Sequence, residues 1–225
     1  MLRLRDHDPN YFSRALSSTE HWRIFPEFRD SVAYLDIETT GMGDWQDHIT
    51  TISLYDGETI HYYVYGDNLD QFPDDIMKYK VVVTYNGKCF DIPFINRYFR
   101  ITMDQAHIDL RYILHRLGYK GGLKGCEKQL GLSRDELDGV DGYTAVLLWR
   151  DFENNKNQRA LETLLAYNIL DAVNLETLMV TAYNLKLRET PFLESHQLTV
   201  PDLPCNPFEP DVRTLERIMA ARGGW

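Results

Sequence analysis

The order of hydrophobic and polar residues changes along the chain and predicts alternating strands and helices. In the first half, short runs rich in apolar, β-branched and aromatic residues predict strands. These runs occupy 32–37, 49–55, 59–65 and 79–85. Asp56 and Gly57 separate the second run from the third and are typical of a hairpin turn. The last run is dominated by valine and predicts a buried strand.

Helical spacing dominates the second half of the chain. Helices are expected at 91–98, at 109–117, in a short segment ending at Leu130, at 142–151 and at 158–183, with one more strand at 106–108. The longest of these helices carries leucine and isoleucine at three-to-four spacing, which predicts a stripe facing a core. Strands that alternate with helices in this way indicate an α/β fold.

Neither period continues into the two ends of the chain. Residues 1–30 mix charges and aromatics and are expected to form a packed N-terminal extension of the domain at 31–184. Five prolines between Leu187 and Pro210 exclude one regular element there. We therefore expect 185–225 to form a proline-rich C-terminal arm that wraps the domain and ends in a short helix.

Composition indicates a soluble globular protein. With 225 residues, of which 44% are hydrophobic, the chain can form one domain with a sizeable core. No apolar run approaches the roughly 18 residues of a membrane span, and the first residues are charged, so neither a membrane protein nor a secreted one is expected. The three cysteines lack a Cys-x-x-Cys pair, which argues against a disulfide framework or structural zinc. The cytoplasm is the expected compartment.

The net charge of −10 disfavours tight, metal-independent binding to long nucleic-acid duplexes, because phosphate binding relies on Lys and Arg. It does not exclude a nuclease, since a carboxylate-rich site is itself acidic and bound cations reverse its potential. One segment is basic against this background. Its basic residues are Arg111, Arg116, Lys120, Lys124 and Lys128. The segment is either a track for phosphate groups or a solvated helix face.

Four carboxylates occupy positions that can converge. Asp36 and Glu38 lie two residues apart on a predicted strand, so both point to the same face. Asp91 begins a helix after a buried strand, where capping that helix is the alternative role. Asp171 lies four residues after Tyr167 on the longest helix, so the two share one side of it. Such carboxylates can hold two divalent cations for phosphodiester hydrolysis.

The order and spacing of these residues resemble the DEDD (DnaQ-like) superfamily of metal-dependent 3′→5′ exonucleases. The matching motifs are Asp36-Ile37-Glu38, Asn86 before Phe90-Asp91, and Tyr167 before Asp171. A tyrosine at this position is typical of the tyrosine branch, called DEDDy. The resemblance covers roughly residues 31–184 and implies an RNase H-like α/β fold. In that fold a central mixed five-stranded sheet, with its first three strands antiparallel, is flanked by helices.

A further set of residues looks most like the YprB-like branch of ribonuclease H-like exonuclease domains. These residues are Leu123-Lys124, Leu130-Gly131-Leu132, Arg134, Asp138 and Gly142. They lie between the second and third acidic motifs and are followed by Tyr167 and Asp171.

The resemblance also implies roles for individual residues. Two divalent ions, Mg²⁺ or Mn²⁺, would be bound, the first by Asp36, Glu38 and Asp171 and the second by Asp36 and Asp91. Tyr167 would orient the attacking water. The residues expected to bind substrate are Thr39, Gly41, Met42, Asn86 and Lys124.

The predicted activity is a 3′→5′ exonuclease that releases nucleoside 5′-monophosphates from single-stranded DNA or RNA ends, with nucleic acid as its partner. The main alternative is a catalytically silent RNase H-like module that binds nucleic acid or a protein. Because the chain retains all four carboxylates together with Tyr167, the sequence favours the enzyme. Structure-selective or endonucleolytic cleavage is a third possibility, since it would use the same metal chemistry.

Overall fold

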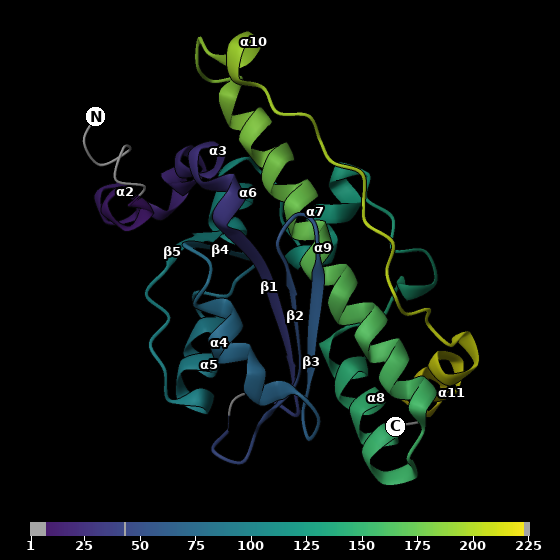
Figure 1. Ribbon diagram of the computed structural model, residues 1–225. Helices are drawn as coiled ribbons and strands as arrows, with labels where there is room; N and C mark the ends of the chain where they lie inside the picture. The colour runs from purple at the N-terminus through teal and green to yellow at the C-terminus, as the bar shows by residue number, and fades with distance from the viewer. Residues whose placement is uncertain (1–7, 43, 223–225) are drawn as a thin grey trace.

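The computed structural model of the protein describes residues 8–42 and 44–222, and a five-stranded mixed sheet lies at its centre (Figure 1). The strands are β1 (Val32–Thr39), β2 (Ile49–Tyr55), β3 (Ile60–Val64), β4 (Val81–Thr84) and β5 (Ala106–Asp109). Their order is β3-β2-β1-β4-β5. Strands β1, β2 and β3 are antiparallel neighbours, whereas β4 and β5 run parallel to β1. The predicted central sheet is therefore confirmed.

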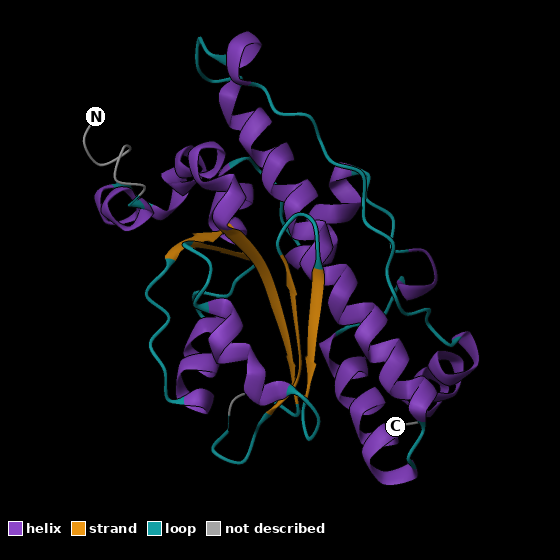
Figure 2. Cartoon of the chain, in the orientation of Figure 1, coloured by secondary structure: helices purple, strands orange, loops and turns teal. Residues whose placement is uncertain are grey.

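Helices cover both faces of this sheet, as Figure 2 shows. In chain order the helices are α2 (Pro9–Ala15), η1 (Ser18–Ile24), α3 (Phe25–Phe28), η2 (Arg29–Ser31), η3 (Leu69–Gln71), α4 (Phe72–Ile76), α5 (Asp91–Phe99), α6 (Leu110–Arg116), α7 (Gly122–Leu130), η4 (Asp135–Leu137), α8 (Gly142–Asn155), α9 (Gln158–Leu187), α10 (Leu193–His196) and α11 (Val212–Arg222). All five helices expected in the second half of the chain are present. Among the described residues, no helix combines the length and the apolar character needed to cross a membrane.

Side chains of β1 alternate between two hydrophobic cores. Val32 and Tyr34 belong to the core that α6 and α9 cover, together with the helices near the N-terminus. Ala33 and Leu35 belong to the core on the opposite face, under α4 and α5. This alternation has a period of two, so residues 36 and 38 are directed to the α9 face.

Helix α9 is the longest element and is buried along most of its length. Its 30 residues contain neither glycine nor proline and span about 45 Å at 1.5 Å per residue. The helix lies across the sheet, with α8 beside it and the C-terminal arm along it (Figure 1). It continues to Leu187, beyond the predicted end at residue 183. Residues from its first half face the C-terminal part of β1, where the candidate site lies.

The segment before β1 is helical and covers the edge strand β5. His21, on η1, places Nδ1 2.8 Å from the His107 carbonyl oxygen of β5. Trp22 and Phe25 are buried in the same core as α9. Residues 1–7 of the predicted extension lie outside the described residues.

The segment after α9 runs back along that helix (Figure 1). Asn184 and Leu198 exchange two hydrogen bonds, of 2.8 and 2.9 Å, between side chain and backbone. The segment ends in α11, which packs against α8 and α9 and whose first turn is capped by Asp211. The division of the chain at residues 30 and 184 into extension, domain and arm stays a prediction.

Candidate active site

Strand β1 supplies the first two carboxylates of the site. Asp36 pairs in register with Ser53 of β2, and Glu38 pairs with Thr51. The register shifts between Glu38 and Thr39, which marks an irregularity at this end of the strand. Both carboxylates are directed to the α9 face, as the alternation of the strand predicts.

Helix α9 brings the third carboxylate to the same place. Asp171 is 5% exposed, and one of its oxygens lies within 4.8 Å of an oxygen of Asp36 and of Glu38. Tyr167, one turn earlier, is also buried and lines the same cleft as the three carboxylates. The structure thus brings residues from the two ends of the predicted domain together.

Asp91 approaches this cluster from the start of α5. It is buried and lines the same cleft, but it is not among the three residues whose oxygens converge within 4.8 Å. Residue Phe90 occupies the N-cap position of α5 and makes no side-chain cap. The alternative role of Asp91 as the N-cap is therefore not observed.

The electrostatics of the cluster are unfavourable without a cation. Burial, and then the charge of Asp171, raise the pKa of Asp36 and of Glu38 well above the ordinary values. Burial also raises the pKa of Asp91 to about 7, and the charges of Asp109 and Asp171 add to this effect. Carboxylate oxygens are the ligands preferred by Mg²⁺ and Mn²⁺, so the donor set fits a hard divalent cation that would neutralise it.

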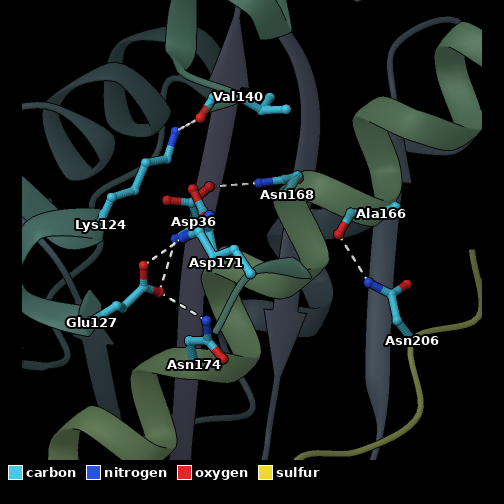
Figure 3. Close-up of polar contacts among 10 residues, drawn as sticks. Asp36, Lys124, Glu127, Val140, Ala166, Asn168, Asp171, Asn174 and Asn206 are labelled. Carbon is cyan, nitrogen blue, oxygen red and sulfur yellow. Dashed lines mark hydrogen bonds and ion pairs between the residues drawn. The ribbon is translucent and has the colours of Figure 1, made fainter. Parts of the chain in front are cut away.

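A hydrogen-bonded pair fixes the orientation of Asp36. Asn168 of α9 donates from Nδ2 to Asp36 Oδ2 at 2.7 Å (Figure 3). Its side-chain oxygen accepts a hydrogen bond from Ser53 Oγ at 2.8 Å. Asn168 is fully buried, so its amide has no access to water. Helix α9 therefore supplies both a carboxylate and the group that orients a second carboxylate.

A buried arginine pairs with Asp171. The Nη1 atom of Arg134 lies 2.5 Å from Asp171 Oδ1, while Nε and Nη2 bind the Glu127 carboxylate. Burial alone would lower the pKa of Arg134, but the facing carboxylates of Asp171 and Glu127 outweigh it and raise that pKa. The guanidinium is thus a permanent positive charge beside the cluster.

Tyr167 is held as a neutral phenol. Burial, and then the charge of Asp171, raise its pKa far above the usual value. Lys124 places its ammonium nitrogen 4.6 Å from the centre of the ring and donates to the Val140 carbonyl. Lys124 is therefore turned towards Tyr167 and is not extended into the open cleft.

The carboxylates lie in a cleft of about 740 Å³ with a mixed lining. Arg111 and Lys120 contribute positive charge to it, and Asn86 lines it as well. Asn86 adopts a positive φ of 66°, and its backbone N–H donates to Asp109 Oδ1 at 2.8 Å. Asp109 also caps α6 by accepting from the Arg111 N–H at 3.0 Å.

The other residues expected to bind substrate lie outside the lining of this cleft. Thr39 donates from its hydroxyl to the Gly41 carbonyl at 2.6 Å, and the Met42 side chain is 91% exposed. A Cβ on Gly41 would collide with the carboxylate of Asp47. The Asp47 carboxylate, which accepts hydrogen bonds from the Thr40 hydroxyl and the Asp44 N–H, would have to move to accommodate it.

Four residues that support the site have no role predicted from the sequence: Glu127, Arg134, Asn168 and Asn174. Asn168 and Asn174 lie on α9 within three residues of Asp171, and buried asparagines on an apolar helix were the available signal. Glu127 and Arg134 are distant in sequence from every acidic motif, and no spacing rule connects them with Asp171.

Comparison with known proteins assigns this domain to a broad group. The family profile described as RNase_H superfamily matches residues 33–183, from β1 to the C-terminal part of α9. Together with the order of the strands, this match confirms the predicted RNase H-like fold. No curated protein sequence matches significantly.

Among solved structures, the chain is similar to the family B DNA polymerase from the hyperthermophilic archaeon Pyrobaculum calidifontis. The match covers 70% of this chain and 29% of the polymerase chain, with 16% sequence identity and a TM-score of 0.45. The chain thus corresponds to less than a third of the polymerase.

Proposed function

The chain belongs to the RNase H superfamily, and from this membership and its converging carboxylates we propose that it is a metal-dependent 3′→5′ exonuclease. Its substrates would be single-stranded DNA or RNA ends, and its products nucleoside 5′-monophosphates. The observation that carries the proposal is the convergence of Asp36, Glu38 and Asp171 within 4.8 Å, with Tyr167 in the same cleft. We assign the chain to the DEDDy branch and propose a relationship to the YprB-like domains, which its sequence motifs resemble.

The carboxylates would have distinct roles. Asp36, Glu38 and Asp171 would hold one divalent cation, Mg²⁺ or Mn²⁺, and Asp36 would share a second cation with Asp91. When bound, two such cations activate a water molecule and stabilise the oxygen that leaves. Asn168 holds one oxygen of Asp36 by its hydrogen bond and so restrains the orientation of this carboxylate in the cluster.

Tyr167 would position the attacking water by a hydrogen bond. Because its pKa is raised, the phenol keeps its proton at neutral pH and cannot act as the general base. Arg111 and Lys120 in the cleft wall supply positive charge for the backbone phosphates of the substrate. Asn86 would contact the substrate from the same wall, and Thr39, Gly41 and Met42 would approach the terminal nucleotide from the loop after β1. Lys124 would have to turn away from the Val140 carbonyl and the Tyr167 ring to contact the substrate.

A direct test compares the purified chain with Asp36→Asn and Asp171→Asn on 5′-labelled single-stranded RNA and DNA. We expect ladders that shorten from the 3′ end with Mn²⁺ or Mg²⁺, no cleavage with EDTA, and no detectable cleavage by either variant. Asp104→Asn is the matched control, because it removes an equal charge from an exposed position outside the cleft.

Two results would contradict the proposal. Full activity of a folded Asp36→Asn or Asp171→Asn would exclude these residues as metal ligands. Absence of cleavage by the wild type on all substrates, with folded protein and bound Mn²⁺, would favour a catalytically silent module that binds nucleic acid or a protein. Internal cleavage products would indicate the endonucleolytic alternative.

A further inference from the structure

Arg134 connects the cluster to a second buried carboxylate. Its side chain is 4% exposed, and its nitrogens face two acids. Nε and Nη2 bind Glu127 at 2.5 and 2.8 Å, and Nη1 lies 2.5 Å from Asp171 Oδ1. Among the described residues, Arg134 Nη1 and Asp171 Oδ1 are both buried and neither has a hydrogen-bond partner, so the polar contact recorded for each is their ion pair. Loss of this ion pair would leave two buried polar atoms without a partner.

Glu127 is itself held in place on α7. It is 1% exposed and accepts a hydrogen bond of 2.8 Å from Asn174 Nδ2 (Figure 3). Asn174 lies three residues after Asp171 on α9, so the two side chains share a helix face. The network thus joins α7, the turn before η4 and α9 through buried groups.

We propose that Arg134 is a positioning residue for the metal site, which clamps one oxygen of Asp171 so that its other oxygen faces Asp36 and Glu38. This inference rests on the proposed metal-dependent function. Asp171 would then offer a cation a carboxylate whose orientation is fixed before the cation arrives. The positive charge would also reduce repulsion among the clustered carboxylates in the metal-free protein.

The guanidinium suits this role better than an ammonium does. A planar fork can bind both oxygens of Glu127 and still present a third nitrogen in a fixed direction, whereas lysine offers a single flexible point charge. A positive charge near a metal ligand also repels a cation. The charge of Arg134 therefore lowers the affinity for a cation, whereas its orientation of Asp171 raises it. Groups that orient a metal ligand contribute about 10- to 100-fold in affinity, and we expect orientation to dominate in this buried network.

The test is calorimetric titration of Mn²⁺ into the EDTA-treated full chain. We expect Arg134→Gln to raise the dissociation constant for Mn²⁺ by about 10- to 100-fold. Arg134→Lys keeps the charge without the fork, so it should fold and still bind Mn²⁺ at least about 10-fold more weakly than the wild type. If Arg134→Gln does not fold, Arg134→Lys decides the question.

Glu127→Gln is the matched control for a purely structural role. This change breaks the Arg134–Glu127 ion pair but leaves the Arg134–Asp171 contact in place, so it should lower stability more than it lowers Mn²⁺ affinity. Weaker Mn²⁺ binding by Arg134→Gln than by Glu127→Gln would support the inference. Equal or tighter Mn²⁺ binding by Arg134→Gln or Arg134→Lys than by the wild type would overturn it. Failure of the wild type itself to bind Mn²⁺ would instead overturn the proposed function, and the inference with it.

Discussion

A change at Tyr167 tests the proposed positioning of water separately from metal binding. Tyr167→Phe keeps the buried ring but removes its hydroxyl. We expect kcat to fall by about 100-fold, the order of loss that follows when a reacting group is misplaced. Mn²⁺ affinity should stay unchanged, because no carboxylate is altered. Single-turnover hydrolysis and Mn²⁺ titration of the same preparation would check this.

The kcat of Tyr167→Phe should lie between that of the wild type and that of the aspartate variants. A loss as complete as that of Asp36→Asn would give Tyr167 a role beyond orienting water. No loss would remove it from the reaction and leave it as a packing residue beside Lys124, whose ammonium lies 4.6 Å from the ring centre.

The proximity of the residues that meet in the cleft was predictable because local rules place them. Strand alternation puts Asp36 and Glu38 on one face, and a helical turn puts Tyr167 and Asp171 on one side of α9. No local rule predicts the role of Arg134, because this residue lies between α7 and η4, where the sequence has no periodic pattern. Its role follows only from the tertiary contact with Asp171.

Among the secondary-structure elements, long regular apolar patterns were predicted well and short irregular segments were not. β1 and α9 bury long apolar stretches, so the spacing of apolar residues in their sequences predicts a strand and a helix. The segment from Pro9 to Ser31 instead forms four short helices, because its aromatic residues pack into an existing core beside β5. Tertiary packing rather than local propensity determines such segments.

Strand β5 offers a prediction about pH. The His107 ring Nε2 lies 2.8 Å from the Thr84 hydroxyl, which accepts the Gly87 N–H and so has its proton free to donate to the ring. Burial lowers the pKa of His107 to about 4; the charges of Lys88 and His21 act in the same direction, and that of Asp109 opposes them. Neutral His107 is therefore the form that fits the fold.

The direction in which stability changes with pH follows from the lower pKa of His107 in the folded protein. As pH falls below about 6.5, the unfolded chain protonates His107 first, so this contribution to stability is complete above that pH and declines towards pH 4. Between pH 6.5 and 5 the loss should be about 2 kcal/mol. His107→Gln should lose less over the same interval in urea denaturation of the metal-free proteins. Identical pH profiles for the two proteins would contradict this assignment.

In the molecule as a whole, the net charge and the lining of the cleft have opposite effects on nucleic-acid binding. The net charge of −10 makes the surface as a whole repel nucleic acid, whereas the carboxylate cluster is set in a cleft whose walls include Arg111 and Lys120. In the proposed function, binding energy would be concentrated at this place and would depend on a cation that neutralises the cluster. The acidic composition is thus compatible with a nuclease that acts on strand ends.

The C-terminal helix α11 connects the predicted arm to the cleft. α11 buries Leu215 and Ile218 against α8 and α9, and Arg222 pairs at 2.8 Å with Asp141, the N-cap of α8. Gly142, the next residue, lines the cleft. Leu215→Ala should therefore lower the free energy of unfolding by about 2–5 kcal/mol.

The matched control is Met219→Ala on the same helix, where the side chain is 40% exposed and little stability should be lost. Thermal and urea denaturation of both variants would measure the difference. Equal stability of Leu215→Ala and the wild type would mean that α11 is not docked in solution. The predicted arm would then be a separate appendage. A large loss confined to Leu215→Ala would make the arm part of the fold that shapes the cleft, because its terminal helix is anchored to the cap of α8.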